Sequence, residues 1–82
     1  MVKILALLNN LILIAQVEEV ETELGGPDCK LIKPFVVKSD ETLEPFLCDY
    51  TSQDIFMMSS DKILTLVDPK PTLLEKYQNL TK

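Results

Sequence analysis

Arginine, histidine and tryptophan are absent from this chain of 82 residues, and glycine and cysteine occur only twice each. Without histidine, the chain lacks the side chain whose ordinary pKa suits proton transfer near neutral pH. No serine, cysteine or lysine stands beside a recognisable general base, so the sequence marks no nucleophile. We therefore identify no catalytic residue and expect a protein that is not an enzyme.

Positive charge is scarce. Eight lysines face thirteen carboxylates, which gives a formal net charge of -5. Proteins that bind nucleic acid mainly through its phosphates need a positive surface, because the release of counterions drives that binding. The planar guanidinium that binds phosphate with two parallel hydrogen bonds is missing as well. The composition argues against an extensive phosphate-binding surface.

The two cysteines, Cys29 and Cys48, stand in apolar surroundings. Free cysteine is among the most buried residue types, so we expect two reduced thiols in the core. A disulfide in an oxidising compartment is the alternative. Two thiols without histidine do not complete the four-ligand shell of zinc, so we expect no metal site of this kind and no cofactor.

Glu18, Glu19, Glu21 and Glu23 precede Asp28 and form an acidic stretch. Carboxylate oxygens suit calcium or magnesium, which makes a cation site one interpretation. The alternation of these residues with apolar ones is more typical of the exposed face of a strand, and we adopt that interpretation.

Long hydrophobic runs are also lacking, because Asn9-Asn10 divides the apolar N-terminal stretch into two short pieces. Each piece falls far below the roughly 20 residues that cross a bilayer, and the amides interrupt the core that a signal peptide requires. We expect a cytoplasmic protein without a membrane partner. The hydrophobic content of 46% is high for so short a chain and favours a homo-oligomer that hides apolar surface.

Residues 2–8 and 11–17 form two apolar runs joined by Asn9-Asn10, which predicts a two-residue hairpin with positive φ at the asparagines. Beyond Val17 the apolar residues change parity, which predicts a bulge or bend near Glu18-Glu19. The second strand then serves two parts of a small barrel.

Turn signals and apolar runs divide the rest of the chain. Pro34 marks an edge or bulge, residues 46–50 predict a short strand or extended loop, and Thr72 with Glu75 forms a capping box. We predict a single domain, residues 1–82: a mainly β, five-stranded, strongly bent antiparallel barrel with a short C-terminal helix. The expected strands are residues 2–8, 11–24, 29–38, 54–58 and 62–67, and the helix is 72–80.

Two segments resemble the Sm-like (Lsm) family of small SH3-like barrels. The first comprises residues 8–11, Ala15, Val17 and 28–31, and the second is residues 56–66, an apolar strand, a tight turn and an apolar strand. The whole sequence is also similar to small proteins encoded by marine cyanophages.

The resemblance implies a homo-oligomeric ring that binds single-stranded RNA through Asp28, Ser59, Ser60 and Lys62. The chain departs from the family pattern where Ser59-Ser60 replaces Arg-Gly and where Asp28 replaces a base-reading asparagine. A carboxylate cannot replace an amide that both donates and accepts. The alternative is therefore a ring-forming adaptor that binds a host or phage protein without nucleic acid. For residues 59–62, an ordinary hairpin turn is the other interpretation.

Overall fold

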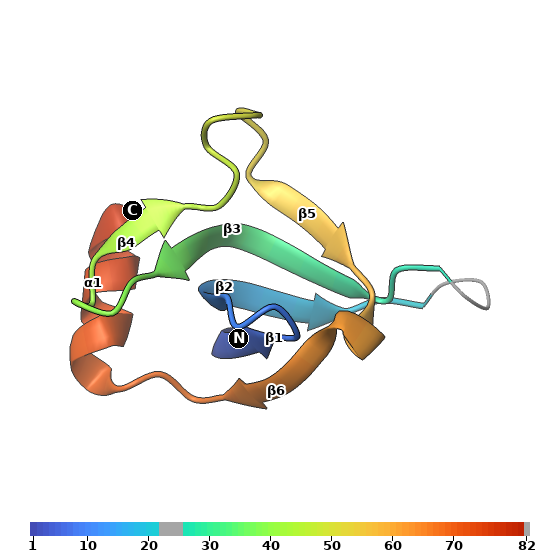
Figure 1. The fold of residues 1–82 in the computed structure, drawn as a ribbon, viewed down its shortest axis with the longest axis horizontal. Coiled ribbons are helices and arrows are strands. Elements are labelled where there is room, and N and C mark those ends of the chain that lie inside the picture. The colour runs from blue at the N-terminus through green and yellow to red at the C-terminus, as the bar shows by residue number, and fades with distance from the viewer. Residues whose placement is uncertain (22–25, 82) are drawn as a thin grey trace.

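The computed structural model of the protein describes residues 1–21 and 26–81, and these form an antiparallel β-sheet with one C-terminal helix (Figure 1). The elements in chain order are β1 (Val2–Leu7), β2 (Ile12–Glu19), β3 (Cys29–Val37), β4 (Leu43–Pro45), β5 (Ile55–Met58), the short 3-10 turn η1 (Ser60–Lys62), β6 (Ile63–Val67) and α1 (Pro71–Leu80). The predicted mainly β class and the C-terminal helix are confirmed.

β3 is the strand that connects the sheet. One of its edges pairs with β2, and the other is shared between β5, which pairs with Cys29–Ile32, and β4, which pairs with Phe35–Val37. β2 continues to β1, and β1 pairs with β6. In Figure 1, β4 and β5 lie along one side of the bent β3 and β6 lies on the far side of β1 and β2.

The prediction of a five-stranded closed barrel is wrong in two respects. The sheet has six strands, and β5 and β6 do not pair with each other, so the described strands leave the barrel open. The additional strand, β4, precedes the segment 46–50, which forms turns. Leu47 there has a φ of 59°, a left-handed conformation that cannot continue a strand.

The first hairpin forms between β1 and β2, with a longer loop than predicted. The amide of Leu7 donates to the carbonyl of Leu11, so the loop comprises Leu8–Asn10. Asn10 alone has positive φ, at 67°. This arrangement is typical of a loop in which a turn is followed by one left-handed residue, a conformation that asparagine tolerates.

A β-bulge bends the sheet between β2 and β3. Ile14 pairs with Phe35 and Gln16 with Ile32, so Ala15 alone faces the two residues Lys33 and Pro34. The bulge predicted at Glu18-Glu19 is therefore wrong, because those residues still pair with β3 in register. Thr22 and Leu24, part of the predicted parity change, lie outside the described residues.

The core lies on the inner face of the bent sheet. Alternate residues of β1, β2 and β3 are buried there, namely Leu5, Leu7, Leu13, Ala15 and Leu31. Fully burying a leucine side chain stabilises the fold by about 1.5–3 kcal/mol. The bulge reverses the phase of β3, so beyond it Val36 packs on this core while Phe35 points to the opposite face.

α1 covers the outer face at the bulge. The Tyr77 hydroxyl donates to the carbonyls of Ile32 and Lys33, both at 3.0 Å. The Tyr77 ring contacts the Phe35 ring edge to face, with 5.8 Å between the ring centroids. Burial raises the pKa of the Tyr77 phenol, which keeps this donor protonated.

The predicted capping box at Thr72 and Glu75 is wrong, because the helix begins with Pro71 and its N-cap, Lys70, makes no side-chain hydrogen bond. A proline fits the first helical position, because an N–H there would have no hydrogen-bond partner within the helix. No helix among the described residues has both the length and the apolar character needed to cross a membrane.

Lys33 has a φ of 51° at the bulge, which is costly for a residue with a Cβ. We expect Lys33→Gly to raise the free energy of unfolding by about 1 kcal/mol, because glycine adopts this conformation without strain. Lys30→Gly, in an extended part of the same strand, is the control and should lower it by about 1 kcal/mol. Urea denaturation measures both values, and a loss of stability in Lys33→Gly would contradict the strain.

Candidate functional site

The structure brings two of the four predicted RNA contacts together at the corner between β5 and β6. The Asp28 carboxylate accepts hydrogen bonds from the amide and the hydroxyl of Ser60, both at 2.7 Å, although the residues lie 32 positions apart. Ser59 donates its hydroxyl to Asp61, its neighbour in the same turn. We call Asp28 and residues 59–62 the Asp28 corner.

Hydrogen bonds explain the electrostatics of this corner. The side-chain hydrogen bond from Ser60, followed by the backbone one, holds the pKa of Asp28 below its ordinary value. Asp28 is thus a carboxylate near neutral pH, and its oxygens hold the turn in place. Both serine hydroxyls are directed at carboxylates, so neither is free to donate to a phosphate in this arrangement.

Lys62 is the cation of the Asp28 corner. Its side chain is exposed, and it forms no ion pair with any residue in the described part of the chain. An exposed ammonium beside a turn can meet a phosphate as a point charge. Its neighbours Asp28 and Asp61 oppose such an anion, so Lys62 carries whatever attraction this corner offers.

The other candidate ligand groups are dispersed. Within residues 1–21 and 26–81, no three acidic or cysteine side chains gather as a metal site would require, and Glu23 lies outside these ranges. Cys29 is buried as predicted, and burial followed by the charges of Asp28 and Glu19 raises the pKa of its thiol. Cys48 is exposed, contrary to prediction, because residues 46–50 turn away from the sheet.

Two sheet edges carry exposed apolar side chains and no charged residue. β6 pairs with β1 alone, and its Leu64 is 67% exposed. β5 pairs with β3 alone and exposes Ile55 and Met57. We call these the β5 edge and the β6 edge. An edge strand without charge or proline is open to pairing with another strand.

β4 presents a different kind of edge. It has only three residues, it ends in Pro45, and its Glu44 forms a 2.9 Å ion pair with Lys38. Short length, proline and charge are the features by which proteins protect an edge from association. The β5 edge and the β6 edge lack both the proline and the charge that β4 has.

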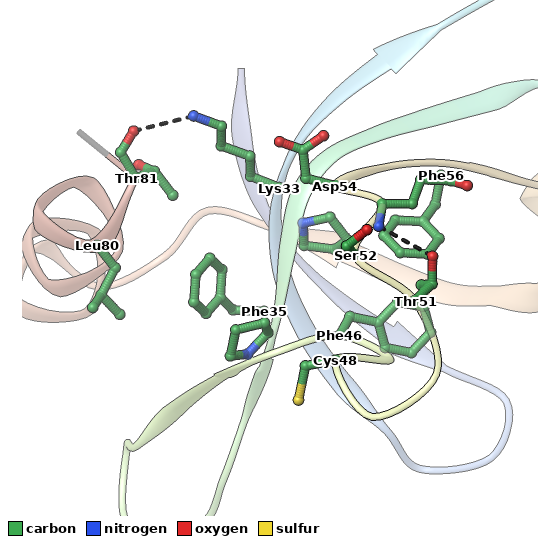
Figure 2. A pocket seen from close by; sticks show the side chains of 13 residues that line it. Lys33, Phe35, Phe46, Cys48, Thr51, Ser52, Asp54, Phe56, Leu80 and Thr81 are labelled. Atoms are coloured by element: carbon green, nitrogen blue, oxygen red, sulfur yellow. Dashed lines mark hydrogen bonds between the residues drawn. The ribbon is translucent and has the colours of Figure 1, made fainter.

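A cavity of about 400 Å³ lies beside the bulge of β3, between β4 and β5 (Figure 2). Its wall comes from the bulge, the 46–54 connection and the end of α1, and sequence reasoning missed it. The signals available were Pro34 and the lysine that breaks the apolar alternation before it. Neither could reveal that the distant 46–54 segment returns to this point.

The sequence matches one protein family over residues 1–82, and that family is described as "Family of unknown function (DUF6561)". A comparison with curated proteins gives no match.

Because the folded-state pKa of Asp28 is lowered, its charge contributes stability above the ordinary value of 3.8, and the contribution is lost as the pH falls through the folded pKa. We expect Asp28→Asn to melt below the wild-type protein at neutral pH. The difference in Tm should shrink as the pH drops below 3.8.

Thermal melts followed by circular dichroism measure this difference. Asp49→Asn is the control, since among the described residues the one donor directed at the Asp49 carboxylate is the weak Cys48 thiol, 4.0 Å away. A Tm difference for Asp28→Asn that stays constant with pH would contradict the assignment.

Proposed function

This chain belongs to the DUF6561 family, and from its geometry we propose that it is a non-enzymatic assembly module that forms a homo-oligomeric ring. The observation that carries the proposal is the pair of charge-free edges with exposed apolar side chains. Leaving Leu64, Leu66 and Val67 in water is unfavourable, and a paired strand would cover them. In this proposal each β6 edge pairs with the β5 edge of the next copy.

The choice of a ring over a two-fold dimer follows from the number of open edges. A dimer through two β6 strands would leave both β5 edges uncovered. Head-to-tail pairing of the β6 edge with the β5 edge covers both, and such a heterologous contact closes into a ring when the rotation permits. The sheet would then continue from each copy to the next around the ring, while the barrel of each copy stays open between β5 and β6.

The two cysteines bear on the location of the protein. Two free thiols suit a reducing compartment, so we place the ring in the cytoplasm, that of the host if the protein is phage-encoded.

We expect the wild-type protein to elute as an oligomer, and Leu64→Lys to be monomeric, because a lysine on the β6 edge opposes strand pairing. Leu8→Lys is the matched control: Leu8 is 59% exposed but lies in the first hairpin loop, and this variant should remain oligomeric. Size-exclusion chromatography with light scattering, at tens of micromolar protein, measures the mass. A monomeric wild-type protein would remove the proposal.

Cross-linking distinguishes the two modes of pairing. In a Cys48→Ser background, one batch carries Met57→Cys on β5 and the other carries Thr65→Cys on β6. Head-to-tail pairing predicts a disulfide dimer only when the batches are mixed. A dimer formed by the Thr65→Cys batch alone would indicate β6 pairing with β6 and contradict the ring.

Single-stranded RNA is the second candidate, as a ligand of the ring, and Lys62 is the observation that favours it. Repetition around a ring would place several such ammonium groups together, although each copy also adds Asp28 and Asp61. The acidic net charge of -5 favours instead the adaptor role, in which the ring binds a basic host or phage protein.

Fluorescence anisotropy with labelled RNA separates these roles. If RNA binds, Lys62→Gln should weaken binding, because a phosphate contact is lost. The slope of log affinity against log salt concentration should become shallower by about 1. Lys70→Gln, an exposed lysine at the start of α1, is the control and should leave binding unchanged. Absence of binding at micromolar protein in low salt would eliminate the RNA role and leave the adaptor.

A further inference from the structure

The cavity beside the bulge includes Phe56 of β5 in its wall, and we call it the bulge cavity. It is formed by β3 at Lys33-Pro34, by the 46–54 connection and by the last turn of α1. With a volume of about 400 Å³ it lies in the range of small-molecule sites.

Two of the four non-glycine residues with positive φ in the described part of the chain lie at the bulge cavity. Lys33, on its wall, has a φ of 51°, and Leu47, between two wall residues, has a φ of 59°. Such conformations persist only where the surroundings impose them, and they cluster at ligand-binding positions. Here the bond from the Lys33 amide to the Asp54 carbonyl, 2.6 Å long, fixes the strained residue against the 46–54 connection.

Aromatic side chains form part of the wall of the bulge cavity, beside polar ones from Thr51, Ser52 and Gln53. Figure 2 shows Phe35, Phe46 and Phe56 around it, with the phenyl rings of Phe46 and Phe56 in edge-to-face contact at 5.5 Å. Rings fixed in this way form a rigid surface, which suits a flat or branched apolar group at low entropic cost.

The wall includes one cation and one anion, Lys33 and Asp54; in Figure 2 the Lys33 side chain extends toward Thr81 and the Asp54 carboxylate lies on its other side. The Lys33 ammonium makes a single long hydrogen bond, 3.4 Å to the Thr81 carbonyl, and pairs with no carboxylate of the described residues. The Asp54 carboxylate accepts no hydrogen bond and forms no ion pair among those residues. The two groups form no ion pair with each other, so each is available to a ligand.

We propose that the bulge cavity binds a free amino acid with an aromatic or branched apolar side chain. Its carboxylate meets Lys33, its ammonium meets Asp54, and its side chain lies against the phenyl rings of Phe46 and Phe56. The two ligand charges are joined through one carbon atom, so a single ligand can present an anion to Lys33 and a cation to Asp54, both of which line the bulge cavity. A ligand with one charge would leave the second charged group facing an apolar chain.

Amide chemical shifts in an NMR titration with L-phenylalanine test the proposal, with phenethylamine, hydrocinnamate and glycine as probes that each lack one feature. We expect saturable shifts at millimolar L-phenylalanine, centred on Phe46 and Asp54, and weaker binding of all three analogues. Lys33→Gln and Asp54→Asn should each lower the affinity for L-phenylalanine roughly threefold or more. The controls Lys30→Gln and Asp49→Asn should not.

Cys48 supplies a second readout, since its exposed thiol lines the bulge cavity. Bound L-phenylalanine should slow its alkylation by iodoacetamide, whereas Cys29 is buried and unreactive. Repeating the titration in Leu64→Lys separates this inference from ring formation, because a monomer keeps the bulge cavity. Equal binding of the single-charge analogues, equal losses in the controls, or no protection of Cys48 would each overturn the proposal.

Discussion

Lys33 and Pro34 interrupt β3, the strand that pairs with three others, and the remaining architecture depends on this bulge. Proline has no amide to donate, and the left-handed lysine before it turns the chain. Pairing with β5 ends on one side of the bulge and pairing with β4 begins on the other. The carbonyls of Ile32 and Lys33 become the acceptors that dock Tyr77 and so fix α1.

The same bulge separates the two surfaces from which function is inferred. On one side, β5 and β6 diverge and leave two apolar edges without a partner in the described chain. On the other, β4 is short and closed to pairing, and the space between it and β5 becomes the bulge cavity. The proposed assembly surface and the proposed ligand site therefore meet at β5 and are otherwise built from different elements.

The Asp28 corner illustrates how one contact can serve structure at the expense of a predicted role. Asp28 is charged, but its charge is used to hold the Ser60 amide and hydroxyl. The turn that joins β5 to β6 is thereby anchored to the start of β3. This anchoring helps to set the direction in which the β6 edge leaves the corner, so Asp28 would bear on the proposed assembly without touching a ligand.

Local pattern in the sequence determined the strands that are apolar and alternating, the first hairpin, the proline bulge in β3 and the C-terminal helix, because these depend on neighbours along the chain. It misjudged features that depend on distant partners. Residues 43–45 became a strand because β3 offered them a free edge beyond the bulge, and Cys48 became exposed because the following turns leave the sheet. Only the tertiary structure brought Ser60 to Asp28, Tyr77 to the carbonyls of β3 and Asp54 to Lys33, since no periodicity within a segment records where a loop returns.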